Sequence, residues 1–140
     1  MRKTDIIDVI ARKLAPFVFL FGFYLVAFGH RTPGGGFQGG VVIASGVILL
    51  ALGRNPRAAL SAFPVSRLSV AEVLSYTLLL ALGILGMTLG GRFLENVLPT
   101  YGGGIVPRVS FIFALNIVIG IKVGAGVSLI CLHLFERESR

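Results

Sequence analysis

Residues 30–40 read His-Arg-Thr-Pro-Gly-Gly-Gly-Phe-Gln-Gly-Gly, and this stretch separates two apolar runs, at residues 14–29 and 41–53. Glycine permits backbone conformations with positive φ and lets another backbone approach closely. Pro33 fixes its own φ and favours an extended conformation at Thr32. The stretch, called the Gly segment below, therefore predicts a shaped turn between two apolar helices.

The composition is that of an integral membrane protein. Of the 140 residues, 55% are hydrophobic and only 14% are charged, and the mean hydropathy is +0.90. Soluble domains carry roughly 25% charged residues. No small-residue cleavage site follows the basic start of the chain, so we expect the first apolar run to remain as a helix. Residues 1–140 are expected to form a single membrane domain.

Four apolar segments predict four transmembrane helices, at about residues 7–29, 35–53, 70–91 and 109–135. The run from Val41 is too short to cross a hydrocarbon core of roughly 30 Å, so the second span is expected to begin near Gly35. Non-helical backbone at that depth must be covered by protein or face water. The predicted fold is all-α, with a Gly-rich loop between the first two helices formed by Thr32, Pro33, Gly34, Gly35, Gly36, Phe37, Gln38, Gly39 and Gly40.

The basic residues predict the orientation of the helices. The net charge is +7, which in a soluble protein would favour nucleic acid, but here the Lys and Arg residues flank the apolar spans. Most of them lie in the two tails and the middle loop, and only Arg31, Arg92 and Arg108 lie on the other side. The positive-inside rule then places both termini in the cytoplasm and the Gly segment outside. We expect no nucleic-acid partner.

The acidic residues set a limit on what the chain does alone. On the predicted spans, every carboxylate lies in a tail, a loop or the mouth of a span: Asp5, Asp8, Glu72, Glu95, Glu136 and Glu138. A stand-alone cation carrier generally needs a carboxylate inside the membrane, so partner subunits would have to supply it. Glu72, at the mouth of the third span, is a candidate entrance for cations, although a single charged residue at a span mouth is more often just solvated.

Lys122 is the exception, because it lies near the middle of the fourth predicted span. A charge there costs at least about 2.5–3.5 kcal/mol and must face a carboxylate, a carbonyl or water. Two interpretations remain open: a residue that relays protons or tunes an ion path, and a residue that pairs permanently with another subunit. Asn116, on the same span, is a weaker ion-path candidate, and Gly120, Gly124 and Gly126 favour close helix packing.

The remaining polar residues do not indicate an enzyme or a metal site. His30 ends the first span, can titrate near neutral pH and is a further ion-path candidate, but it has no second ligand nearby in sequence, so no metal site is expected. The Gly segment lacks the Lys and the preceding strand of a phosphate-binding loop. No nucleophile–base arrangement is evident, so we expect no catalytic activity from this chain.

The stretches at residues 28–40 and 116–126 together carry a family resemblance. The sequence resembles the MnhB family, a family of small subunits of the Mrp-type multisubunit sodium/proton antiporters, through Phe-Gly-His-Arg-Thr-Pro-Gly-Gly-Gly-Phe-Gln-Gly-Gly and Asn-Ile-Val-Ile-Gly-Ile-Lys-Val-Gly-Ala-Gly. The resemblance implies a four-helix, non-catalytic subunit of a cell-membrane assembly that exchanges Na+ for H+, without a cofactor of its own. Its partners would be the other small and large antiporter-type subunits, in a region proposed to carry sodium.

The resemblance leaves the setting of that assembly open. Related modules are built into archaeal membrane-bound hydrogenases and sulfur-reducing complexes, where hydrogenase- or sulfur-reductase-type subunits would be partners. Two other functions are considered. A purely structural scaffold remains open, whereas a stand-alone exporter of the small multidrug type needs a carboxylate in its first helix, and residues 14–29 contain none.

Overall fold

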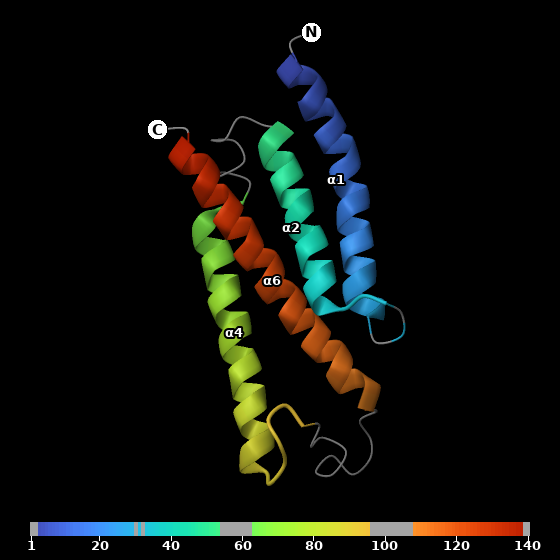
Figure 1. Cartoon of the computed structure of the whole chain (residues 1–140), viewed down its shortest axis with the longest axis vertical. Coiled ribbons are helices and arrows are strands. Elements are labelled where there is room, and N and C mark those ends of the chain that lie inside the picture. The colour runs from blue at the N-terminus through green and yellow to red at the C-terminus, as the bar shows by residue number, and fades with distance from the viewer. Residues whose placement is uncertain (1–2, 30, 32, 54–62, 96–107, 139–140) are drawn as a thin grey trace.

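The structure is a computed structural model that describes residues 3–29, 31, 33–53, 63–95 and 108–138. This part of the chain forms the helices α1 (Lys3–Phe28), α2 (Gly36–Gly53), α4 (Val65–Thr88) and α6 (Arg108–Glu138) (Figure 1). Each helix contains a segment long and apolar enough to cross a membrane. The predicted all-α, multi-pass membrane protein with four such helices is confirmed. The sides of the membrane that the two ends face remain a prediction.

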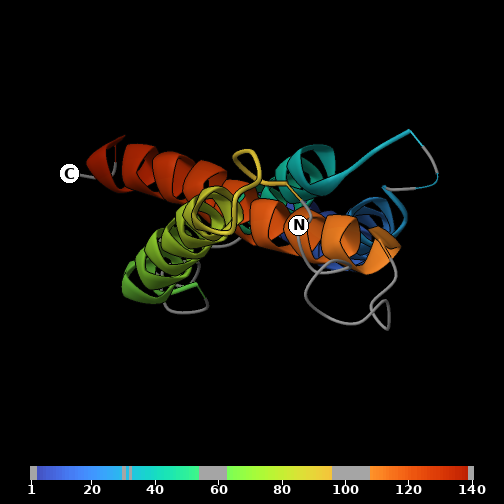
Figure 2. The same cartoon turned by 90° about the horizontal axis from the view of Figure 1, so that it is seen from below.

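Successive helices run in opposite directions, so α1 and α4 begin at the same end of the molecule as α2 and α6 finish (Figure 1). α1 packs against α2, α2 against α6, and α4 against α6, whereas α1 contacts α6 only slightly. Seen from below, α6 runs between α4 on one side and α2 on the other (Figure 2). α6 is therefore the helix that joins the α1–α2 pair to α4.

Much of the Gly segment is helical. α2 begins at Gly36, so Gly36 to Gly40 form its first turn rather than a loop. Gly35 precedes the helix with a φ of 136°, which a residue with a side chain rarely adopts, and its carbonyl accepts a hydrogen bond of 2.9 Å from the Gly39 N–H. Most backbone groups of Gly36 to Gly40 are thus satisfied by the helix itself. Thr32, the first residue of the predicted loop, and His30, the predicted end of the first span, lie outside the described residues.

α1 and α2 pack closely because glycines, which have no side chain, lie at their contact. A Cβ atom on Gly39 would lie 2.4 Å from a methyl carbon of Val26, and one on Gly22 would lie 2.7 Å from Ile43. Real Cβ atoms essentially never approach other atoms that closely. Helices that cannot rely on hydrophobic burial in lipid associate through such close backbone packing. The glycines of this pair therefore set the distance between α1 and α2.

α4 starts earlier than the sequence predicts. Pro64 has an extended conformation, and its carbonyl accepts hydrogen bonds from the N–H groups of Arg67 and Leu68, at 3.0 and 3.3 Å. The helix thus begins at Val65 and not near residue 70, because the polar residues of the connection, Arg67 included, continue into its first turn. At the other end, Gly90 has a φ of 86° and reverses the chain. The ring of Phe93 then packs over Gly83.

The four helices are buried to different extents. In the apolar window of α2, 44% of the residues are buried inside the chain, against 11% in that of α4. On α1, Phe17 and Leu20 are 70% and 69% exposed. These apolar faces suit contact with lipid or with other membrane helices rather than with water. α4 is therefore the helix with the most surface available to its surroundings.

Candidate functional site

The two stretches that carry the family resemblance lie against each other. A Cβ on Gly36, at the start of α2, would lie 2.3 Å from the backbone oxygen of Asn116 on α6. A Cβ on Gly40 would lie 2.7 Å from the backbone oxygen of Gly120, and one on Gly124 would lie 3.3 Å from that of Gly40. The backbones of α2 and α6 are thus in direct contact along this line, where no side chain fits between them.

Asn116 connects α6 to the first turn of α2. Its Oδ1 accepts a hydrogen bond of 3.4 Å from the Gly36 N–H, one of the donors that a helix cannot satisfy at its own N-terminus. The Nδ2 atom of Asn116 is buried and donates to nothing within the described residues. The side chain therefore acts as a cap supplied by a neighbouring helix, and its Nδ2 group keeps both N–H donors for other acceptors.

Lys122 lies near the middle of α6 and faces α4. Its Nζ is 5.9 Å from the centre of the Tyr76 ring, within the range of a cation–π contact. The Lys122 side chain is half-buried, whereas Tyr76 is 50% exposed. Within the described ranges no carboxylate comes within ion-pair distance of Lys122. In the isolated chain, the Lys122 ammonium thus contacts the face of the Tyr76 ring.

Glu72 lies on the same face as Tyr76, one turn closer to the start of α4. Because α4 begins at Val65, Glu72 is about 10 Å inside the helix and not at its mouth. A Cβ on Gly126 would lie 3.2 Å from the Glu72 Oε1, so the carboxylate sits directly against the backbone of α6. Glu72 thus lies about two turns inside α4, and its position relative to the membrane remains a prediction.

The predicted site residues thus fall on two sides of α6. Lys122, Glu72 and Gly126 come together on the face that packs against α4, and Tyr76 joins them. Asn116, Gly120 and Gly124 lie on the face that packs against α2. His30 lies outside the described residues. In the part of the chain that the structure describes, no three His, Cys, Asp or Glu residues lie close enough together to hold a metal.

Tyr76 is not among the site residues predicted from the sequence. A signal was available, because Glu72 and Tyr76 on α4 have the same four-residue spacing as Lys122 and Gly126 on α6. Residues four apart lie on one face of a helix, so two such pairs on antiparallel neighbours can meet across the interface. The spacing alone does not show that α4 and α6 are neighbours.

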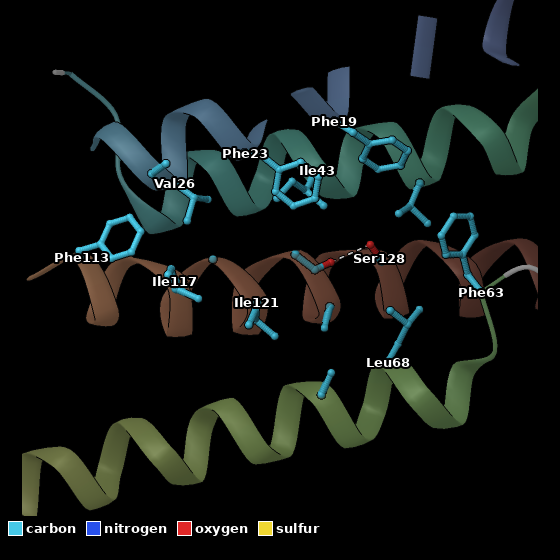
Figure 3. Close-up of a pocket in the computed structure, with 16 residues that line it drawn as sticks. Phe19, Phe23, Val26, Ile43, Phe63, Leu68, Phe113, Ile117, Ile121 and Ser128 are labelled. Carbon is cyan, nitrogen blue, oxygen red and sulfur yellow. Dashed lines mark hydrogen bonds between the residues drawn. The ribbon is translucent and has the colours of Figure 1, made fainter. Parts of the chain in front are cut away.

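A groove of about 610 Å³ lies between α1 and α2 on one side and α4 on the other, with α6 as its floor (Figure 3). Its lining is apolar apart from Ser128, whose hydroxyl donates a hydrogen bond of 2.7 Å to the Gly124 carbonyl. Lys122, Glu72 and Tyr76 do not line this groove. The groove therefore suits hydrocarbon and offers nothing to bind an ion.

The two motifs that meet at the α2–α6 contact also occur in known proteins of one family. A family model described as the domain related to the MnhB subunit of Na+/H+ antiporter matches residues 6–129, which include both motifs. The chain belongs to the MnhB family. The resemblance found in the Gly segment and in α6 is thereby confirmed. The match also covers α1, α2 and α4 almost entirely, so the family assignment rests on the whole bundle.

Three curated relatives illustrate the similarity. An uncharacterized protein of Methanocaldococcus jannaschii is 37% identical over 133 residues, which cover 89% of this chain and 50% of that protein. A Na(+)/H(+) antiporter subunit of Bacillus subtilis is 38% identical over 98 residues, covering 68% of this chain and 66% of that protein. The putative antiporter subunit mnhB2 of Staphylococcus aureus strain Newman is 31% identical over 138 residues, covering 92% and 96%. The chain thus spans about half the length of the archaeal relative.

Proposed function

We propose that this MnhB-family chain is a non-catalytic membrane subunit of a multisubunit Na+/H+ antiporter and helps to form or support its sodium translocation region. The family description and the name of the Bacillus subtilis relative support the subunit role. Na+ and H+ would be the ions transported by the complex, and the other antiporter subunits would be its partners. The expected location is the cell membrane.

The observation that carries this proposal is Lys122. A cation in the middle of an apolar helix is costly unless it is paired, hydrated or functional. Within the described residues the Lys122 ammonium meets the Tyr76 ring and no ion-pairing carboxylate. An ion path formed with neighbouring subunits therefore explains a charge at Lys122 better than a simple contact between helices does.

The scaffold function is the second candidate, and the glycine contacts favour it. The direct packing of α2 against α6 at Gly36 and Gly40, and of α2 against α1 at Gly39, gives a closely packed unit, and the apolar faces of α1 and α4 could support neighbouring helices. A scaffold needs no charge in the middle of α6. Lys122 therefore distinguishes the two functions.

The test is Lys122→Met in the complete complex, with assembly and Na+/H+ exchange measured separately. Assembly is followed by co-purification of the partner subunits, and exchange by sodium-induced pH changes in everted membrane vesicles. Lys13→Met, an exposed change of the same kind on α1, is the matched control. We expect Lys122→Met to assemble and to exchange Na+ for H+ with an altered rate or an altered apparent KM for Na+. Normal assembly with normal exchange would remove the coupling role, and lost assembly would favour the scaffold.

The setting of the complex is a separate part of the proposal. It is either a plain antiporter or a redox-driven pump with hydrogenase- or sulfur-reductase-type subunits. The genes that neighbour this one would distinguish the two settings, because a redox arm requires those additional subunits.

A further inference from the structure

The α4–α6 interface contains two opposite charges one helical turn apart. The Lys122 ammonium lies 5.9 Å from the centre of the Tyr76 ring. Glu72 precedes Tyr76 by four residues and so lies on the same face of α4. On α6, Gly126 follows Lys122 by four residues and meets the Glu72 carboxylate. Both charges therefore face the same contact between antiparallel helices, and about 5–6 Å of helix rise separates their levels.

The two charges do not pair directly. The described part of the chain contains no ion pair of Glu72 or Lys122, and no described side chain donates a hydrogen bond to the Glu72 carboxylate. Glu72 is partly buried and is the only acidic residue of α4, which is mostly apolar. A carboxylate in such surroundings is stabilised only by a cation, a proton or water. It therefore has unused capacity to bind a cation.

We infer that Glu72 is the binding carboxylate of a monovalent-cation site on the α4–α6 interface, where Na+ and the Lys122 ammonium compete for it. The Tyr76 ring holds the ammonium while Na+ occupies the carboxylate. This inference rests on the proposed antiporter function, because that function supplies the cation. The exchange involves no covalent step, since one cation replaces another on the same oxygen atoms.

The side chains have the properties that this competition requires. Lysine carries a compact charge on a flexible four-carbon stem, so its ammonium can move between a ring and a carboxylate one turn away. The ring face attracts a cation without binding it as strongly as a carboxylate does. Oxygen ligands suit hard cations such as Na+. Gly126 lets the carboxylate lie against α6, because a Cβ there would be 3.2 Å from the Glu72 Oε1.

The test measures the apparent KM for Na+ of the complete complex in everted vesicles at fixed pH. Glu72→Gln should raise this KM about tenfold, the scale expected for the loss of one charged ligand. Lys122→Met should lower the KM, because the internal competitor is gone. In the Glu72→Gln background, Lys122→Met should have no further effect on the KM, since the two side chains act on the same site.

A second carboxylate variant and an assembly assay serve as controls for the Glu72 variants. Glu95→Gln removes the same charge from a carboxylate that accepts a hydrogen bond from the Arg92 N–H beyond the end of α4, and it should leave the KM unchanged. Co-purification reports assembly for every variant. If Glu72→Gln does not assemble, Glu72→Asp carries the test, because it keeps the charge, moves it back by one carbon and should also raise the KM.

Two results would overturn the inference. One is an assembled Glu72 variant with an unchanged KM for Na+. The other is a Lys122→Met effect of equal size with and without the Glu72 carboxylate. Failure of the proposed function gives a different result, namely normal exchange by a complex from which this whole chain has been deleted.

Discussion

Replacement of Gly36 by Ala tests the contact between the two family motifs. The added Cβ would lie 2.3 Å from the backbone oxygen of Asn116, whereas ordinary contacts begin at 3.4 Å. Since the opposing atom belongs to the backbone, α2 and α6 must separate by about 1 Å and lose packing contacts. Such overpacking costs about 3 kcal/mol. The higher helix propensity of Ala returns at most about 1 kcal/mol, so the net loss is about 2 kcal/mol.

The assay is thermal melting of the detergent-solubilised complex, followed by gel filtration of the heated samples. A loss of about 2 kcal/mol should lower the Tm by about 4–8 °C for a domain of this size. Gly124→Ala is the matched control, because its Cβ would lie 3.3 Å from the Gly40 oxygen and requires only a small adjustment. It should change the Tm by less than about 2 °C. Equal melting of the Gly36→Ala variant and the wild type, or an equal loss in both variants, would refute the reasoning.

Three further predictions concern Asn116, Tyr76 and Gly83. Asn116→Ala removes the acceptor of the Gly36 N–H and should lower the Tm by about 2–4 °C, as expected for a lost helix cap; an unchanged Tm would show that this bond contributes nothing. Tyr76→Leu should raise the KM for Na+, because Lys122 loses its ring, whereas Tyr76→Phe should leave it unchanged; equal behaviour of the two variants would contradict the role of the ring. Gly83→Ala should lower the Tm less than Gly36→Ala does, because its Cβ meets the movable ring edge of Phe93 and not backbone; an equal or larger loss would contradict this distinction.

The sequence predicts the helices better than their contacts. Apolar runs long enough to cross a bilayer predict four helices, and the structure contains four within the residues it describes. The boundaries are less predictable where polar residues continue a helix. Arg67 lies inside α4, although a count of charged residues assigns it to the loop. For the same reason the sequence predicts Glu72 near the start of the third helix, whereas it lies about 10 Å inside α4.

The site required the tertiary structure for a different reason. Lys122 is recognisable from sequence, because a charge within an apolar run is unusual at any position. Its neighbours are harder to recognise. Glu72 stands out as a carboxylate but not as a neighbour of Lys122, and Tyr76 resembles an ordinary residue of α4 until α6 is placed beside it. In the same way, the glycines of α2 predict close packing without showing that the Asn116 backbone is what they meet.

The composition and the order of the residues suffice to predict the membrane class, the number of helices, the family and the charge in the middle of the fourth helix. They suffice for these properties because each span must satisfy its own backbone hydrogen bonds in lipid. The packing of the helices, in contrast, shows that α6 joins α2 to α4, that Gly36 lies on Asn116, and that Glu72 and Lys122 share one interface. Those pairings depend on which helix faces fit together, and glycine permits close contact with a neighbouring backbone without specifying which one.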